Sequence, residues 1–252
     1  TLQRAHPFPR EERIAFDEPT HTYTVDGITV PLSVTGLVHQ YSSSFDARAV
    51  IAQMQARQSW EQKQHEFLRD DGSVMSAQEI MQKWEANGLA QRSRGTLLHY
   101  HIELHLNGAT IEEPQSPEFQ QFLDIGRLVM PQFKIFRTEL SMFHCGLGIA
   151  GQADCLCLDD NGDIVIWDWK RSKEIRTDSR QQMLPPLQHL PDCNYFTYAL
   201  QLNLYRYILE SEYLMRVSHM ILGIAHPLRS VPLCPELQKM DTGIATIVAH
   251  AR

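Results

Sequence analysis

The sequence predicts an α/β fold, in which a central mixed sheet is flanked by helices. Residues 133–170 contain three short runs dense in β-branched and aromatic residues, which are typical of strands. A helical stretch at 195–211 and a further apolar run at 218–226 follow, so helices and strands alternate along the chain. Hydrophobic residues make up 43% and charged residues 21% of the 252 positions, an ordinary composition for a globular protein with a substantial core.

We expect three parts: a mostly helical N-terminal extension over residues 1–90, a core domain over 91–228 and a C-terminal tail over 229–252. Residues 21–30 alternate between polar and apolar side chains around an Asp-Gly pair, which is typical of a two-residue hairpin turn. The helices expected before the strands of the core cover residues 46–69, 76–88 and 90–106, and another begins at Ser116-Pro117.

Charge and hydropathy exclude several classes of protein. The net charge of −7 argues against binding to nucleic acid through bulk positive charge, although carboxylates that hold cations lower this count. No apolar run is long enough to span a membrane, and the N-terminus lacks the apolar region of a secretory signal. We therefore expect an intracellular protein without membrane contact. A chain that begins at Thr leaves a mitochondrial location open beside a nuclear or cytoplasmic one.

Two carboxylates and a lysine follow the apolar runs of the predicted strands. Asp154 stands in one run, and Asp168 and Lys170 flank Trp169 at the end of the next, where alternation puts them on one face. Neighbouring strands lie about 5 Å apart, so both carboxylates could form an oxygen site for Mg²⁺ or Mn²⁺. A surface Asp–Lys pair is the alternative, but the run IVIWDWK indicates a strand buried on both faces.

Four further features accompany these residues in chain order. They are a Gly-x-x-x-His pattern on a predicted helix, a glutamate in the first strand, small residues before the first aspartate, and a Gln and a Tyr one turn apart on the following helix. In this sequence they are Gly95 to His99 with Glu103 one turn beyond, Glu139, Gly148 to Gly151, and Gln201 with Tyr205.

The combination resembles the RecB-like nucleases of the PD-(D/E)xK superfamily, which have a restriction-endonuclease-like core. Their motifs run in the same order: GxxxH, an acid, G-x-x-D, D/E-x-K and QxxxY. The likeness covers about residues 90–226. Segments 31–38, 95–103 and 148–173 are also similar to the mitochondrial genome maintenance exonuclease group, although viral and bacterial relatives share much of the same text.

This resemblance implies a set of metal ligands, a catalytic set, and a pair that contacts DNA or braces the site. The ligands would be His99, Asp154, Asp168 and the carbonyl of Trp169; the catalytic residues Lys170, Asp168, Asp154 and Glu139; and the pair Gln201 and Tyr205. Members that carry an iron–sulfur cluster need four cysteines, one of them before the nuclease motifs. Cys145 is the first cysteine of this chain, and only Cys234 lies in the tail, so we expect no cluster.

Several polar side chains are candidates for contacts with the phosphates of nucleic acid. Arg94 precedes the GxxxH histidine, and Arg171 and Lys173 follow Lys170 directly. A plain solvated loop is the alternative for this basic run. Ser33 could bind phosphate at the start of a short helix, or could simply cap that helix.

We therefore expect a Mg²⁺- or Mn²⁺-dependent deoxyribonuclease that hydrolyses DNA from single-stranded ends, in DNA repair, replication or recombination. The preference for ends rests on the resemblance and on a helical extension that could roof the site. An endonuclease of the same superfamily is one alternative. Another is a catalytically silent module of the same fold that binds nucleic acid or supports an assembly. The intact Asp154, Asp168 and Lys170 favour catalysis, and the sequence indicates no particular protein partner.

Overall fold

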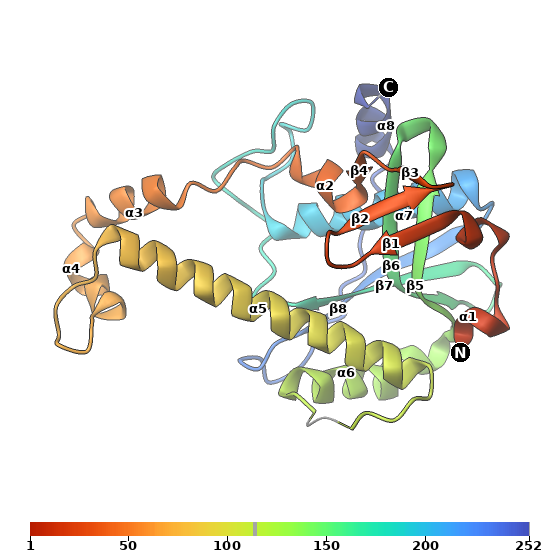
Figure 1. The fold of residues 1–252 in the computed structure, drawn as a ribbon, viewed down its shortest axis with the longest axis horizontal. Coiled ribbons are helices and arrows are strands. Elements are labelled where there is room, and N and C mark those ends of the chain that lie inside the picture. Colours follow the sequence, from red (N-terminus) through yellow and green to blue (C-terminus); the bar gives the residue numbers. More distant parts are fainter. Residues whose placement is uncertain (113–114, 252) are drawn as a thin grey trace. The chain divides into compact units, whose positions relative to one another are not determined.

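The computed structural model describes residues 1–112 and 115–251, so the final residue of the expected tail lies outside the described part (Figure 1). The chain divides into two compact units. Unit 1 contains Thr1–Ser43 and Leu98–Arg252, and unit 2 contains Ser44–Leu97. This division differs from the three ranges expected from the sequence, because residue 90 lies inside one continuous helix, α5 (Ala77–Leu106).

Unit 1 is built on a five-stranded mixed sheet. Its strands are β4 (Leu32–Ser33), β5 (Lys134–His144), β6 (Ile149–Leu158), β7 (Ile164–Arg171) and β8 (Val217–Ala225). β6 pairs with three strands: β5 and β7, which are antiparallel to it, and β4, which is parallel to it. β8 pairs with β7 and runs parallel to it. The expected α/β fold with a mixed sheet is therefore confirmed.

Helices cover both faces of this sheet (Figure 1). The helices α2 (Val34–His39), α7 (Asn194–Glu212) and α8 (Asp241–His250) pack in one core cluster, and α6 (Pro117–Leu128) with the C-terminal part of α5 packs in another. β7 lies between them, with Ile164 and Ile166 in the first cluster and Trp167 and Trp169 in the second. Its apolar sequence thus serves a strand buried on both faces, as predicted.

A small three-stranded sheet near the N-terminus packs on the same unit. It consists of β1 (Ile14–Asp17), β2 (Thr22–Val25) and β3 (Ile28–Thr29), with the predicted Asp-Gly turn between β2 and β3. The helix α1 (Leu2–Ala5) precedes it, and short 3₁₀ helices lie at Pro9–Arg13, Gln64–Phe67, Met130–Gln132 and Cys145–Leu147.

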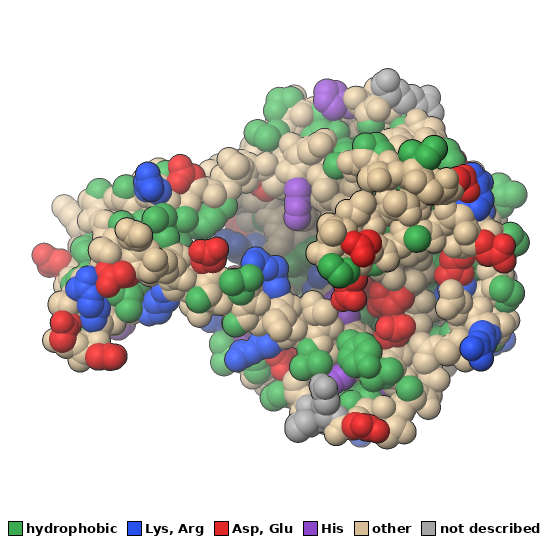
Figure 2. Space-filling view, in the orientation of Figure 1, with side chains coloured by type: hydrophobic (Ala, Val, Ile, Leu, Met, Phe, Trp, Pro, Cys, Tyr) green, Lys and Arg blue, Asp and Glu red, His purple; other side chains and the backbone are tan. Residues whose placement is uncertain are grey.

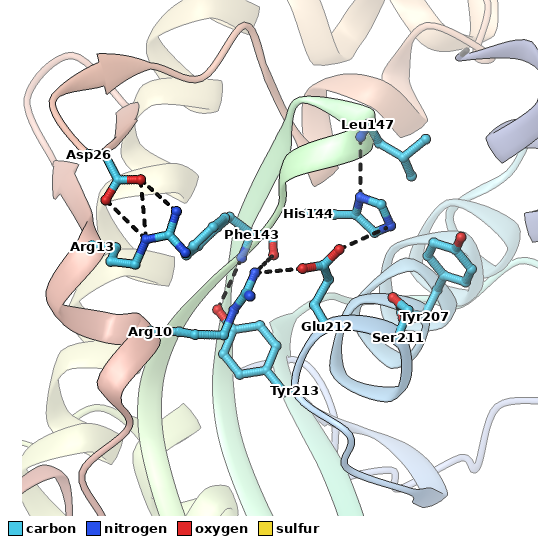
Figure 3. Close-up of polar contacts among 10 residues, drawn as sticks. All are labelled: Arg10, Arg13, Asp26, Phe143, His144, Leu147, Tyr207, Ser211, Glu212 and Tyr213. Atoms are coloured by element: carbon cyan, nitrogen blue, oxygen red, sulfur yellow. Dashed lines mark hydrogen bonds and ion pairs between the residues drawn. The ribbon is translucent and has the colours of Figure 1, made fainter.

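Arginine side chains fasten this small sheet and the segment before it (Figure 3). Arg10 lies over the rings of Phe143 and Tyr213, at 4.4 and 4.9 Å from their centroids, and its guanidinium pairs with Glu212 at 2.7 Å. Glu212 also faces the ring of His144 at 3.6 Å. These contacts join the N-terminal segment to β5 and to the end of α7, and they fix the position of the small sheet within unit 1.

Unit 2 contains α3 (Ala47–Gln55), α4 (Trp60–Lys63) and the N-terminal part of α5. The single helix expected over 46–69 is wrong, because Ile51, Phe67 and Ile80 share one core cluster. A straight helix would separate the first two by roughly 24 Å, at 1.5 Å per residue, so the chain turns back to bury both.

The two helices expected over 76–88 and 90–106 are one helix in the structure. The capping box is present, since the N–H of Ser76 donates to the Glu79 carboxylate at 2.7 Å. Gly88 stands inside α5 rather than at its end. A glycine in a helix interior costs only about 1 kcal/mol, which the good helix formers on either side can offset.

The C-terminal segment, expected as a tail, contains α8 and packs on unit 1. Asn203 of α7 accepts a hydrogen bond from the N–H of Met240 at 2.8 Å, and Arg206 pairs with Asp241. Leu233 forms a bridge with Ile224 of β8. Within the described ranges, no helix combines the length and the apolar character that crossing a membrane requires.

Replacing Gly223 tests how tightly β7 and β8 pack. A Cβ at Gly223 would lie 2.3 Å from two ring carbons of Trp169, which is almost fully buried. We expect Gly223→Ala to lower the free energy of unfolding by about 1–3 kcal/mol, measured by urea denaturation. Gly126→Ala in α6 is the matched control, because nothing lies within 4 Å of its Cβ position. A Gly223→Ala protein as stable as wild type would contradict this packing.

Candidate metal centre

Three carboxyl groups stand in a row across β5, β6 and β7. The register between β5 and β6 places Glu139 opposite Asp154. The ladder between β6 and β7 ends at Cys155 and Trp167, and the next residues on these strands are Asp154 and Asp168. Because facing residues of neighbouring strands lie about 5 Å apart, the register alone brings three acids from distant parts of the chain close together.

Asp154 lies at a break in the pairing of β6. β4 pairs with Ile149 and Ala150, and the pairs with β7 begin at Cys155, so residues 151–154 belong to neither of these two ladders. The carboxylate of Asp154 accepts a hydrogen bond from the backbone N–H of Trp169 at 2.7 Å instead. The break therefore leaves a carboxylate, and not a backbone carbonyl, as the acceptor for this N–H.

Glycine is required within this break, as the small residues before Asp154 led us to expect. A Cβ at Gly151 would lie 2.7 Å from a ring carbon of Tyr205 and 3.1 Å from the side chain of Val34. The backbone of β6 thus approaches α7 and α2 more closely than any side chain would allow. This approach sets the aromatic ring of Tyr205 directly against the strand that carries Asp154.

Glu139 has a backbone conformation that is uncommon for a residue with a side chain. Its φ is +48°, in the left-handed region, although it lies within β5. Such a conformation costs on the order of 1–2 kcal/mol. The amide of Gln152 donates to the carbonyl of Glu139 at 3.1 Å and helps to hold it. Strain of this kind is concentrated at functional sites, and here it falls on one of the three acids in the row.

The side chain of His99, which belongs to α5, lies beside Glu139 and Asp154. Its Nε2 lies 2.8 Å from the carbonyl oxygen of Trp169. A carbonyl can only accept, so in neutral His99 this contact places the proton on Nε2 and leaves the lone pair on Nδ1. Nδ1 in turn faces a carboxylate oxygen of Asp154 at 3.4 Å. Two lone pairs that face each other in this way are suited to a shared cation.

The donor atoms of His99, Glu139 and Asp154 all lie within 4.8 Å of one another, and imidazole and carboxylate are ligands for divalent cations. Burial and the carboxylates of Asp154 and Glu103 raise the pKa of Glu139 to about 9. Figure 2 shows acidic side chains gathered on this face of unit 1, between the β1–β2 hairpin and the C-terminal part of α5. The residues present therefore fit a divalent cation, which would offset this excess of negative charge.

Asp168 and Lys170 form an ion pair beside this group. The Lys170 ammonium lies 2.6 Å from the Asp168 carboxylate and 5.1 Å from the centroid of the Tyr198 ring. Burial raises the pKa of Asp168 to about 6, although Lys170 acts in the opposite direction. Burial alone would lower the pKa of Lys170, but the carboxylates of Asp168 and Asp154 outweigh it and raise that pKa. Both members of the pair are thus charged at neutral pH.

Gln201 and Tyr205 are buried side chains of α7 that support the Asp168–Lys170 ion pair. The amide of Gln201 lies 3.4 Å from the Asp168 carboxylate and donates to the Tyr205 hydroxyl at 3.0 Å. Of the two roles expected for this pair, bracing the site is the one that these contacts describe. In the structure Glu139 stands with His99 and Asp154, whereas Asp168 faces Lys170 and Gln201.

The candidate phosphate contacts lie outside this group. Arg171 forms a buried ion pair with Glu118, and Lys173 is exposed. Arg94 is exposed on the part of α5 that belongs to unit 2. Ser33 caps α2, where its hydroxyl accepts from an amide one turn along at 2.9 Å.

Two residues near the acids were not expected from the sequence. Tyr198 precedes Gln201 by three positions on α7, a helical spacing that could have indicated a shared face. Tyr23 comes from β2, and burial together with the carboxylates of Glu139 and Asp154 raises the pKa of its phenol. No spacing in the sequence links Tyr23 to these acids, because only the packing of the small sheet on unit 1 brings them together.

No protein-family model matches the chain, and no curated protein matches it. Several solved structures match it, among them two at low identity. The "Putative exonuclease" from Eubacterium rectale is 12% identical, with a TM-score of 0.39, over 62% of this chain and 63% of that one. SSO0001 is 16% identical, with a TM-score of 0.34, over 87% of this chain and 72% of that one. This chain thus spans less than two thirds of the first protein, and both remain distant likenesses.

The affinity for metal should rise with pH. A cation binds the deprotonated carboxylates, and Glu139 keeps its proton up to a pKa of about 9. We expect Mn²⁺ affinity, measured by calorimetry, to increase by up to about tenfold per pH unit between pH 6 and 9, where one proton is released per ion. Glu139→Gln should bind more weakly and flatten this dependence, whereas Glu174→Gln, at an exposed position, should not. A flat profile in the wild type would contradict the raised pKa.

Proposed function

We propose that this protein is a nuclease that uses Mg²⁺ or Mn²⁺ to hydrolyse DNA phosphodiester bonds, with Lys170 as a catalytic residue. One observation carries the proposal: His99, Glu139 and Asp154 offer donor atoms within 4.8 Å of one another, and the next strand sets the Asp168–Lys170 ion pair beside them. A site that hydrolyses a phosphodiester needs acids that hold the cation and an adjacent ammonium that faces the phosphate.

The chemistry divides between the bound cation and the side chains. The cation would polarise the scissile phosphate and lower the pKa of a bound water. Asp168 fixes the ammonium of Lys170, which offsets the negative charge that develops on the phosphate in the transition state. Trp169 holds Asp154 through its N–H and His99 through its carbonyl, so both ligands are oriented before the substrate binds.

The order of the motifs supports the same function. The residues that converge in the structure are the ones on which the resemblance to RecB-like PD-(D/E)xK nucleases rests: His99, Glu139, Asp154, Asp168 to Lys170, and Gln201 with Tyr205. We propose single-stranded DNA ends as the substrate and DNA repair, replication or recombination as the process, from the further likeness to the mitochondrial genome maintenance exonuclease group. That likeness also makes the mitochondrion one of the compartments to examine.

Variants of the ion pair test the assignment. We expect Lys170→Ala to bind Mn²⁺ and DNA but to lower kcat by about 100-fold or more, because charge stabilisation in the transition state is lost. Asp168→Ala should also lower kcat, because it removes the carboxylate that fixes the Lys170 ammonium. Lys134→Ala, an exposed lysine at the start of β5, is the matched control and should cleave as wild type does. If both site variants cleave labelled DNA at the wild-type rate, these residues do not form the active site.

The form of the DNA separates the remaining functions. We expect linear single strands labelled at the 5′ or 3′ end to be degraded with Mn²⁺, circular single strands to stay whole, and EDTA to stop the reaction. Digestion of the circles would identify an endonuclease. Metal and DNA binding without cleavage of any substrate would identify a catalytically silent module.

A further inference from the structure

The ammonium of Lys170 has two neighbours of different kinds. Its Nζ lies 2.6 Å from the carboxylate of Asp168, which belongs to the same strand, and 5.1 Å from the centroid of the Tyr198 ring on α7. A cation within about 6 Å of an aromatic centroid is attracted by the negative charge on the face of the ring. The ring of Tyr198 is therefore close enough to act on the charge of Lys170 as well as to fill space beside it.

The helix α7 contacts both members of this ion pair. Gln201 follows Tyr198 by three residues, so the two side chains lie on one face of the helix. The amide of Gln201 lies 3.4 Å from the Asp168 carboxylate. Between them, Ala199 and Leu200 are buried in the core cluster that joins α7 to α2 and α8. The position of the ring is thus set by a helix that is packed in the core.

The two charged groups differ in exposure. The side chain of Asp168 is 1% exposed and that of Lys170 is 18% exposed, so the ammonium is the group that a substrate can reach. A lysine ammonium stands on a flexible four-carbon stem. The ion pair restricts its distance from Asp168 but leaves other directions open, and the ring of Tyr198 limits it on a second side.

We propose that Tyr198 is a positioning residue for the nuclease reaction, in which the face of its ring holds the Lys170 ammonium toward the scissile phosphate. This inference rests on the proposed function and adds a residue to the same site. Tyr198 acts through Lys170, and the aromatic face rather than the hydroxyl carries the effect. The attraction depends on the charge of the ring face, whereas simple packing depends only on its shape, so the two roles can be separated by experiment.

Variants at position 198 test the ring itself. With Mn²⁺ and linear single-stranded DNA, we expect Tyr198→Phe to keep kcat within about twofold and Tyr198→Leu to lower it by about 5- to 30-fold. The Mn²⁺ affinity should not change. Tyr207→Leu is the matched control, because Tyr207 is a partly buried tyrosine of α7 that packs against the same core cluster and stacks on His144. It should cleave as wild type does.

Fluorinated phenylalanines at position 198 give a readout that a structural role would not move. Fluorine withdraws electron density from the face of the ring and leaves its shape almost unchanged. We expect kcat to fall stepwise with one, two and three fluorines at a constant melting temperature. In a Lys170→Ala background the same series should have no effect, because the ring has no ammonium to hold. A flat series in the otherwise wild-type enzyme, or a stepwise fall in the Lys170→Ala background, would overturn the proposal.

The contact itself can be tested without any activity. In protein labelled with ¹³C-lysine, the Hε signals of Lys170 are identified by their loss in Lys170→Ala. The ring current of Tyr198 should shift these signals upfield in the wild type, and Tyr198→Leu should return them toward the ordinary lysine position. Signals that do not move in Tyr198→Leu would show that the ring does not hold the ammonium, and the proposal would fall whether or not the protein cleaves DNA.

The outcomes for Tyr198 and for the proposed function are distinct. If the wild type cleaves DNA, Lys170→Ala does not, and Tyr198→Leu equals the wild type, the nuclease assignment stands and only the role of Tyr198 is wrong. If the wild type cleaves no DNA with Mn²⁺ or Mg²⁺, both proposals fall together.

Discussion

Mutual repulsion among carboxylates in a partly buried place is the constraint on which the rest of the structure depends. Glu139, Asp154 and Asp168 lie in a row on three strands, and burial makes their charges harder to accommodate than in water. One acid is compensated by Lys170. Burial and the neighbouring carboxylates raise the pKa of Glu139 to about 9, so this acid must lose a proton before it can hold a cation.

The fold makes room for these acids by interrupting its own hydrogen-bond ladder. β6 pairs with β4 near one end and with β7 near the other, and the break between them contains Asp154. Trp169 stabilises the break, because its N–H and its carbonyl bind Asp154 and His99 and its indole packs against Gly223. Two core clusters lie on opposite sides of β7, so its polar end is held by apolar packing that precedes it in the same strand.

Rigid surroundings matter for the proposed phosphoryl chemistry, because catalysis gains from groups that are already in position when the substrate binds. His99 and Asp154 have fixed backbone partners, and Lys170 is held between Asp168 and the ring of Tyr198. The N-terminal sheet packs on the strands β5 and β6, which carry two of the acids. It is joined to β5 and α7 through Arg10, which pairs with Glu212 and lies over the ring of Phe143.

The sequence by itself determined what depends on neighbours along the chain: the α/β class, the Asp-Gly hairpin, the capping box, and the shared face of Asp168 and Lys170, which follows from strand alternation. It also placed the histidine and both aspartates in motif order. Only the tertiary structure decided that Glu139 joins His99 and Asp154, that Tyr23 of the small sheet packs on β5 and β6, and that residues 46–69 fold back on themselves. Register, a positive φ and packing between sheets arise from contacts between distant segments, and local spacing does not encode such contacts.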